Sequence, residues 1–308
     1  MIFKRLYDEQ LAQASYLIGC AGSGSAAVID PTRHVDQYIA AAEAEGLRIE
    51  AVTETHIHAD FVSGTRELAA RTGATMYLSG CGTPEWQYGF RFDPGVRALR
   101  DREIFRVGNV EIRAVHTPGH TPEHLSFLVT DRAVATEPMG LATGDFVFVG
   151  DVGRPDLLEK AAHVAGAADA SARQLWKSLG WFRNLPDHLQ IWPGHGAGSA
   201  CGKGLSAVPQ STVGYEKRFN WAFGAKTEAE FVRQVLAGQP EPPKYFGVMK
   251  RVNREGPPLL GTLPIPERVA EHRVAGLLAS GAVIVDIRPA PDFAAGHLPG
   301  TLSIPFNR

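Results

Sequence analysis

Up to about Phe231 the chain alternates short apolar runs with turn residues, a pattern that predicts strands and helices in alternation. Short apolar runs bounded by glycine, proline or polar residues are typical of strands. We expect strands at 14–20, 26–29, 49–53, 75–78, 110–115, 125–130, 141–143 and 190–192. Apolar residues at helical spacing predict helices at 35–45, 63–72 and 167–179. Together these elements indicate an α/β protein.

The pattern changes in the last quarter of the chain. Prolines cluster at 239–243 and 256–258, and the segment that they bracket has few helix or strand signals, so we expect a connecting arm over 236–265. A new unit is predicted after the arm, with a helix at 267–278 and a strand at 283–286. The expected organisation is therefore a domain over 1–235, the arm, and a small unit over 266–308.

Composition narrows the class of protein. The 308 residues favour two domains, and 44% hydrophobic with 21% charged residues is ordinary for a globular protein. A net charge of −2 without a basic cluster argues against a nucleic-acid or membrane partner. The three cysteines, Cys20, Cys81 and Cys201, lie far apart, which fits a reducing compartment. With no apolar signal core after Met1, we expect a cytoplasmic protein.

Histidines and aspartates gather in four short fragments, each beside glycine or proline or directly after a predicted strand. These fragments are 55–60 (THIHAD), 117–120 (TPGH), 143–145 (TGD) and 193–195 (PGH). Residues i and i+2 of an extended segment share a face, so His56 and His58 can converge on one ion, with Asp60 next in line. Imidazole and carboxylate are ligands of borderline divalent metals. One fragment alone is equally typical of a polar turn or helix cap, but four in this order predict one metal site.

The motif series HxHxD, TPGH, TGD and PGH resembles that of the metallo-β-lactamase superfamily, from residue 1 to about 230. The resemblance implies an α/β fold in which an αββα sandwich of two mixed sheets carries the metal site at one edge. In the two-metal members of that family the first string reads HxHxDH, whereas Phe61 follows Asp60 here. A benzyl group cannot bind a metal, so we expect one metal per chain.

A second resemblance is closer. Residues 144–158 and 54–64 are similar to the persulfide dioxygenase branch, especially bacterial forms fused to rhodanese domains. That resemblance implies one Fe(II) held by two histidines and one aspartate, which in this chain are His56, His120 and Asp145. The residues that would orient these ligands are His58, Asp60 and His195. The implied reaction converts a small thiol persulfide, such as glutathione persulfide, and O₂ to sulfite and the free thiol. Zn(II) stays an alternative, because the ligand types alone do not separate the two metals.

Further residues near the motifs are candidates for contacting the substrate: Arg154, Cys201, Lys203, Lys217 and Arg218. The Arg154 guanidinium offers a fork for a substrate carboxylate, although a structural ion pair is as common. Cys201 could accept or relay sulfane sulfur, against the commoner interpretation of a buried structural cysteine. For Lys203, Lys217 and Arg218, a charged side chain that is simply exposed to solvent is the commoner interpretation.

The C-terminal residues 285–288, 293–300 and 304–305 resemble the first part of a rhodanese domain. The reactive cysteine of that domain comes later, and no cysteine follows Cys201, so we expect either a partial rhodanese-like α/β segment without thiol sulfur transfer or a natural chain that continues into a complete domain. So short a unit is expected to lean on the first domain or to fold incompletely.

Two other functions stay open at this point. One is a Zn-dependent thioester hydrolase of the glyoxalase II kind, which shares the motif series but which Phe61 argues against. The other is a non-catalytic sulfur carrier. The sequence does not separate glutathione, coenzyme A or another thiol as the persulfide carrier, and a homodimer is the commonest oligomer to expect.

Overall fold

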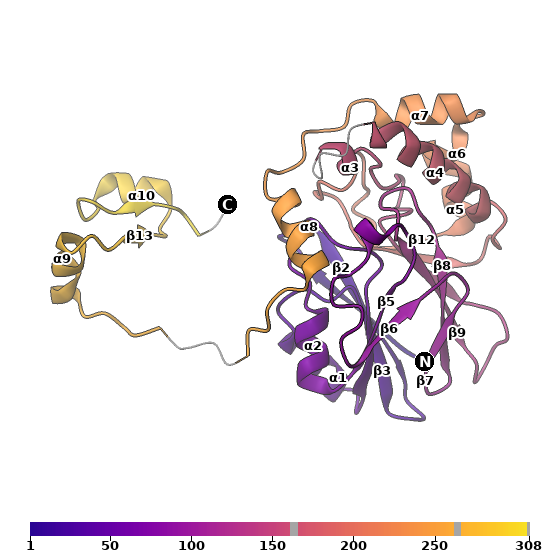
Figure 1. Ribbon diagram of the computed structural model, residues 1–308, viewed down its shortest axis with the longest axis horizontal. Coiled ribbons are helices and arrows are strands. Elements are labelled where there is room, and N and C mark those ends of the chain that lie inside the picture. The colour runs from indigo at the N-terminus through magenta and orange to yellow at the C-terminus, as the bar shows by residue number, and fades with distance from the viewer. Residues whose placement is uncertain (161–165, 262–265, 307–308) are drawn as a thin grey trace. The chain divides into compact units, whose positions relative to one another are not determined.

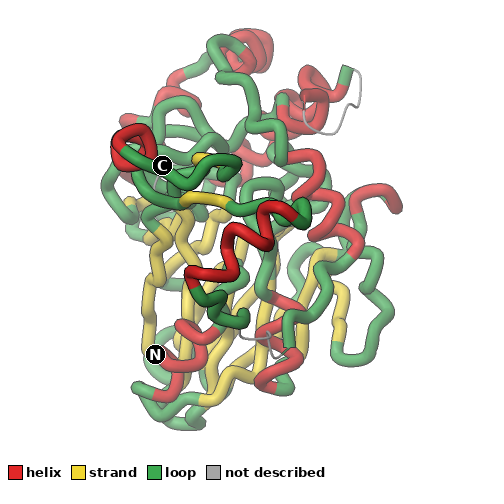
Figure 2. The backbone as a smooth tube through the Cα atoms, turned by 90° about the vertical axis from the view of Figure 1, so that its left-hand side faces the viewer, coloured by secondary structure: helices red, strands yellow, loops and turns green. Residues whose placement is uncertain are grey.

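The computed structural model describes residues 1–160, 166–261 and 266–306, which fall into two compact units, Met1–Leu260 and Gly261–Arg308. In the first unit two six-stranded sheets lie face to face, and helices cover their outer sides (Figure 1). Figure 2, turned by 90°, shows the strands gathered inside this unit and the helices around them. This is the predicted αββα sandwich. Among the described residues, no helix has the length and apolar character needed to cross a membrane.

The first sheet follows the order of its strands along the chain. They are β1 (Ile2–Asp8), β2 (Gln13–Cys20), β3 (Ser25–Ile29), β4 (Arg48–Thr53), β5 (Thr75–Ser79) and β6 (Val96–Leu99). Strands β1 to β3 pair antiparallel, and β3 to β6 pair parallel. The parallel half brings the carboxyl ends of β3 and β4 to one edge of the sheet.

The second sheet contains the remaining strands of the first unit. They are β7 (Ile104–Val107), β8 (Val110–His116), β9 (Leu125–Asp131), β10 (Gly140–Gly144), β11 (Gln190–Pro193) and β12 (Ser211–Thr212). All neighbours pair antiparallel except β10 and β11, which are parallel. The carboxyl ends of β10 and β11 therefore also point to one edge.

Alternation along the strands builds the layers, because successive side chains of a strand face opposite sides of its sheet. Tyr16 and Ile18 of β2 lie in the core between the sheets, together with Phe127 and Trp192 of the second sheet. Leu17, between them in sequence, belongs to the cluster beneath the helices of the first sheet. The buried pattern thus fixes the register of the strands whose ends carry the site.

Helices form the outer layers. Residues of α1 (Asp36–Glu43) and α2 (Thr65–Thr72) pack on the first sheet. Residues of α4 (Ala167–Phe182), α5 (Val213–Phe219), α6 (Trp221–Gly224) and α7 (Glu228–Leu236) pack on the second sheet. Two short pieces, the 3₁₀ helix η1 (Pro84–Trp86) and α3 (Leu157–Lys160), lie in connecting loops. Gly73, with a φ of 76°, ends α2 where the sequence predicted.

Strands β1, β6, β7 and β12 were not predicted. Strand β1 shows why: all its residues are half-buried, because it lies at the edge of its sheet, and its charged side chains hide the alternation. The other three are four residues long or shorter, so their patterns are too brief to detect.

The predicted connecting arm contains a helix, α8 (Phe246–Glu255), that belongs to the first unit. Phe246 packs against Phe148 and Cys201 in a buried cluster. The side-chain amide of Asn253 donates to the carbonyls of His58 and Phe61, at 2.9 and 2.7 Å. The expectation of an arm with few elements was wrong, and the boundary between the compact units lies at Leu260 rather than at 235.

The second unit contains α9 (Glu271–Ala279), β13 (Val285–Asp286), α10 (Ala290–Ala295) and β14 (Leu302–Ser303), with the two strands paired parallel. The predicted helix is confirmed with a later start, and the predicted strand is shorter than expected. All described residues of this unit are exposed or half-buried. Its resemblance to a rhodanese domain stays a prediction.

Candidate metal centre

Four loops that leave strand ends carry the predicted ligands. The loop after β4 holds His56, the loop after β8 holds His120, and Asp145 and His195 follow β10 and β11. Because the sandwich aligns these strand ends, residues up to 139 positions apart in sequence meet in one place.

Three side chains form the first set of possible ligands. The Nε2 atoms of His120 and His56 lie 3.5 and 4.0 Å from Oδ2 of Asp145, and all three residues are buried. Neither carboxylate oxygen of Asp145 has a hydrogen-bond partner among the described residues. A buried carboxylate without partners costs free energy, and a bound cation removes that cost. The set therefore fits a divalent metal.

Hydrogen bonds to the far ring nitrogens fix the tautomers of these histidines. Nδ1 of His120 lies 3.0 Å from the carbonyl oxygen of Arg154, which can only accept, so Nδ1 carries the proton. Nδ1 of His56 lies 3.0 Å from Oγ1 of Thr55, whose own hydrogen is donated to Asp30 at 2.9 Å. Both imidazoles consequently present a bare Nε2 to Asp145, the state that a metal ligand requires.

The backbone of Asp145 is itself held by a further histidine, His124. The backbone N–H of Asp145 donates to Nε2 of His124 at 3.1 Å, and Nδ1 of His124 bonds the Thr117 hydroxyl at 2.8 Å. Burial lowers the pKa of His124 to about 3, so the ring stays neutral and can accept this bond. A Cβ on Gly153 or Gly194 would lie within 3 Å of an Asp145 oxygen, so both glycines permit the close approach of these loops.

A second set of possible ligands adjoins the first and consists of Asp60, His195 and Cys201. Nε2 of His195 lies 3.2 Å from Asp60 and 3.5 Å from Asp145, while its Nδ1 donates to the carbonyl of Ala12. Burial by itself lowers the pKa of His195, but nearby negative charge, led by Asp145, raises it well above the usual value. The buried carboxylates of Asp60 and Asp145 beside His195 therefore attract a proton or a cation to the site.

Cys201 lies at the site as the sequence suggested, but in a form unsuited to sulfur relay. Burial, and after it the charges of Asp60 and Asp145, raises the pKa of its thiol to about 12. A thiol of this pKa is protonated at neutral pH and is a weak nucleophile in the protein alone.

His58 does not belong to the first set of possible ligands. Its Nε2 lies 3.0 Å from Oδ1 of Asp30, and its ring packs against Phe61 with centroids 4.4 Å apart. Burial lowers the pKa of His58, but Asp30 outweighs that effect and the pKa rises to about 9. Asp30 also accepts from the backbone N–H of Thr55, at 2.6 Å. Asp30 was not predicted as a site residue, because it stands 26 residues before His56 in no recognised motif.

The guanidinium group of Arg154 already donates its hydrogen bonds to groups within the protein. Its Nε and Nη2 donate to the carboxylate of Asp156 at 3.0 and 2.8 Å, and its other bonds go to the carbonyls of Ala200 and Pro240. The side chain is fully buried. The expected contact with a substrate carboxylate does not fit this arrangement; Arg154 joins three loops and holds His120 through its carbonyl.

The remaining basic candidates are not brought to the ligands. Nζ of Lys203 donates to the carbonyls of Gln234 and Ala237, at the end of α7. Nζ of Lys217 bonds Asp187 at 2.8 Å, and Arg218 is exposed on α5. Their expected role in substrate binding has no support in these contacts, because each described bond is made within the outer helical layer.

Residues 9–195 match the metallo-beta-lactamase superfamily. The chain is 33% identical over 181 residues to a hydroxyacylglutathione hydrolase of Methylococcus capsulatus, a match that covers 58% of this chain and 60% of that protein. The chain thus spans less than two thirds of that curated relative.

Two solved structures are similar over most of the chain. A metallo-beta-lactamase from Staphylococcus aureus is 43% identical with a TM-score of 0.85, and the match covers 99% of this chain and 85% of that one. ETHE1 from Myxococcus xanthus is 27% identical with a TM-score of 0.67, covering 82% and 98%. With the family matched over more than half of its length and the ligand loops assembled at the edge of an αββα sandwich, the chain belongs to the metallo-β-lactamase superfamily.

Proposed function

We propose that this protein is a mononuclear Fe(II) persulfide dioxygenase that converts a small thiol persulfide, O₂ and water to the thiol and sulfite. The observation that carries the proposal is the set of His56, His120 and Asp145, with Phe61 where two-metal relatives have a histidine. Two histidines and one carboxylate are the facial set of non-haem iron oxygenases. The resemblance of residues 54–64 and 144–158 to the persulfide dioxygenase branch supports the same activity, and the chain is similar in structure to ETHE1 from Myxococcus xanthus.

A bound Fe(II) would supply open coordination positions at which the persulfide sulfur and O₂ come together. The protein's part is to present His56 and His120 as neutral Nε2 donors, fixed by the bonds to Thr55 and to the Arg154 carbonyl. His124 keeps the Asp145 backbone in place. Phe61 packs on His58 and is 4% exposed, so a buried apolar ring stands at the position where two-metal relatives have a histidine.

A Zn-dependent thioester hydrolase is the second candidate, and two observations favour it. The hydroxyacylglutathione hydrolase of Methylococcus capsulatus is 33% identical to this chain over 181 residues. The set of Asp60, His195 and Cys201 offers three more ligand atoms beside the first set. If each set held an ion, the two ions would supply activation of a hydrolytic water.

One experiment separates these two functions. Protein purified without oxygen is analysed for metal, then supplied with glutathione persulfide while O₂ uptake and sulfite are recorded; S-lactoylglutathione hydrolysis is measured in parallel. We expect about one iron per chain, O₂ uptake matched by sulfite, and no thioester hydrolysis. His120→Ala should abolish both iron retention and sulfite formation. Two zinc ions per chain with rapid thioester hydrolysis would overturn the proposal.

A further inference from the structure

A pocket of about 670 Å³ lies on the outer side of the second sheet, beside α4, and none of the candidate metal ligands lines it. Ile104, Val115 and Leu128 line it from β7, β8 and β9, because the neighbours of these residues in each strand point into the core between the sheets. Trp181 adds an aromatic ring from α4. Ile104 is 40% exposed, so the helices leave part of this apolar surface uncovered. The pocket has the volume and the apolar lining of a site for a small molecule.

Cations border this apolar surface. Arg102 and Arg113 lie on the side of the sheet and Lys177 lies on α4, whereas Asp101 is the one acid among the described lining residues. Arg113 already bonds Glu111 at 3.2 Å, and the pair of Arg102 with Asp101, at 3.5 Å, is exposed to water and therefore weak. Lys177 is exposed as well. Arg102 and Lys177 are thus available to an anionic group, and a molecule with an apolar body and one negative charge complements the pocket.

The pocket reaches the loop that carries His120. Pro118, two residues before His120, lines the pocket together with Ser178 of α4, and Oγ of Ser178 donates to the carbonyl of Pro118 at 2.7 Å. The next residue, Gly119, lies so close to α4 that a Cβ on it would be 2.5 Å from Cβ of Leu175. Helix α4 and the His120 loop are therefore in direct contact, and a molecule held between α4 and the sheet restrains both.

We propose that this pocket, which we call the α4 pocket, binds a small amphipathic anion, and that the bound anion raises the affinity of the first set of ligands for metal. The carboxylate or sulfonate of the anion pairs with Lys177 and Arg102, and its apolar body covers Ile104 and Trp181. By restraining the loop, the anion fixes His120 before metal arrives, so that metal binding loses less conformational entropy. Coupling between two sites is reciprocal, so metal raises the affinity for the anion by the same factor. The inference goes beyond the proposed function, because it needs a metal site but no oxidation of a persulfide.

Two fluorescent probes separate the apolar from the anionic part of this interaction. 8-Anilinonaphthalene-1-sulfonate carries the negative charge, and N-phenyl-1-naphthylamine has the same rings without it. In titrations of metal-free protein the sulfonate should bind about 3- to 10-fold more tightly, a modest gain because ion pairs exposed to water are weak. The double variant Arg102→Met and Lys177→Met should remove this difference and leave the affinity for the uncharged probe unaltered. Ile104→Ser should weaken binding of both probes about 5-fold or more, since apolar contact is lost.

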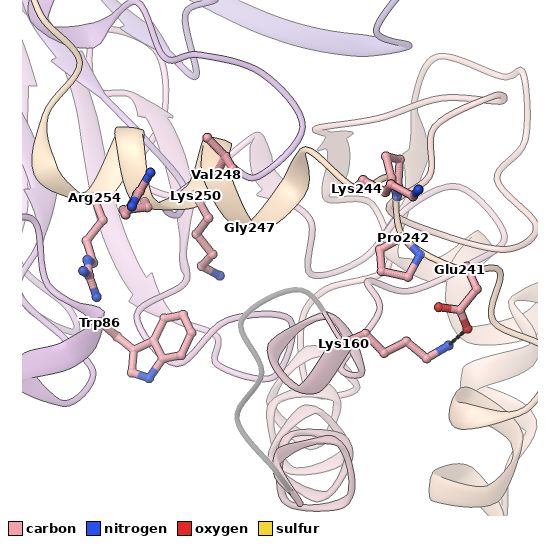
Figure 3. Close-up of a pocket in the computed structure, with 11 residues that line it drawn as sticks. Trp86, Lys160, Glu241, Pro242, Lys244, Gly247, Val248, Lys250 and Arg254 are labelled. Atoms are coloured by element: carbon pink, nitrogen blue, oxygen red, sulfur yellow. Dashed lines mark hydrogen bonds and ion pairs between the residues drawn. The ribbon is translucent and has the colours of Figure 1, made fainter.

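Other basic and apolar surfaces of the chain supply the controls. Lys244→Met alters a separate basic pocket beside α8 (Figure 3), and Phe219→Ser alters an apolar surface of α5, where Phe219 is 66% exposed. Both variants should bind the two probes as the parent does, and thermal unfolding verifies that each variant is folded. No binding of the sulfonate, an affinity for it that is unchanged in the double variant or in Ile104→Ser, or a loss of affinity in either control would overturn the α4 pocket.

The coupling is measured with Zn(II), through competition with a chromophoric chelator, with and without saturating 8-anilinonaphthalene-1-sulfonate. The bound probe should raise the zinc affinity about 5-fold or more, as in other pairs of coupled sites. Ser178→Ala removes the bond between α4 and the Pro118 carbonyl, so it should keep probe binding but lose this increase. A zinc affinity that stays equal or falls when the probe binds, or an increase that Ser178→Ala retains in full, would overturn the coupling.

These measurements use neither O₂ nor a persulfide, so they stand apart from the proposed function. Sulfite formation by a protein that does not bind the probe would keep the dioxygenase and reject the α4 pocket. A zinc affinity that rises with the probe, in a protein without any O₂ uptake, would keep the α4 pocket and reject the dioxygenase.

Discussion

At the level of single residues, the geometry of the first ligand loop depends on Asp30. Its carboxylate accepts from the backbone and hydroxyl of Thr55 and pairs with His58. Asp30 has a φ of 52°, a conformation that aspartate and asparagine tolerate better than other side chains with a Cβ. One buried charge thus binds Nε2 of His58 and, through Thr55, sets the tautomer of His56.

Replacing Asp30 with asparagine tests this role, because asparagine keeps the backbone conformation and removes the charge. Loss of one partner of a buried ion pair should lower the free energy of unfolding by about 3 kcal/mol. Metal affinity should fall about 10- to 100-fold, as for other residues that orient ligands. Urea denaturation and competition with a chelator measure the two effects. Asp36→Asn, whose side chain is 66% exposed, is the control, and an equal loss in both variants would contradict the specific role of Asp30.

Gly194 offers a test of the space around Asp145. A Cβ at this position would lie 2.8 Å from Oδ1 of Asp145, closer than real contacts allow. Gly194→Ala should therefore displace the carboxylate and weaken metal binding at least about 10-fold, with a loss of stability of about 1 kcal/mol. Gly224→Ala, which meets no atom within 4 Å, is the matched control and should bind metal as the parent does. Unaltered metal affinity in Gly194→Ala would show that Asp145 is not a ligand.

At the level of elements, one buried carboxylate stabilises the hairpin formed by β7 and β8. Glu111 accepts from Arg106 at 2.6 Å and from Arg113 at 3.2 Å, and its side chain is 5% exposed. The hydrogen bond from Arg106, and the positive charge around it, lower the pKa of Glu111 below its usual value of 4.5. The stabilisation is thus fully present above pH 4.5 and is lost as the pH falls through the lowered pKa.

Glu111→Gln should accordingly cost about 1 kcal/mol of unfolding free energy at pH 7, since both arginines are largely exposed and water screens the pair. The difference between parent and variant should shrink as the pH is lowered from 5 to 3. Urea denaturation across this range measures it. Glu50→Gln, in an exposed pair with Arg48, should cost almost nothing at any pH. A parent–variant difference that grows on acidification would refute the assignment.

Most of the predicted elements bury a regular set of residues within their own length, although α9 was predicted without any buried residue. Strands β2 to β5 and β8 to β11, and helices α1, α2 and α4, were found because each buries a regular stripe or run. The candidate ligands His56, His120 and Asp145 were expected from the family resemblance of their motifs, and the structure brings these three side chains together. Asp30 and Asn253 were missed, because a side chain that acts by bonding distant backbone leaves no local pattern.

At the scale of the whole molecule, the first unit extends well beyond the strands and helices of the sandwich. After α8 the chain stays docked on α2: Pro257 accepts from Arg66 at 3.0 Å, and the backbone N–H of Leu260 donates to Glu67 at 2.7 Å. Phe246, 1% exposed, completes the cluster around Cys201. The segment that the sequence suggested as a connector is therefore a structural part of the metal site.

Two shortened chains put this conclusion to the test. A chain ending at 260 keeps α8 and its docking bonds, so it should unfold cooperatively and bind metal like the full protein. A chain ending at 235 loses Phe246 and also the bonds of Asn253 to the carbonyls of His58 and Phe61. The cluster that contains Phe148 and Cys201 would then be exposed. Burying one phenylalanine contributes about 2–3 kcal/mol, and each lost bond leaves a buried carbonyl unpaired at about 1 kcal/mol or more. We expect this shorter chain to lose several kcal/mol of stability, to retain little metal and to become reactive toward thiol reagents at Cys201. Equal metal content in the two chains would mean that α8 merely covers the site, and that the four strand-end loops hold their ligands without it.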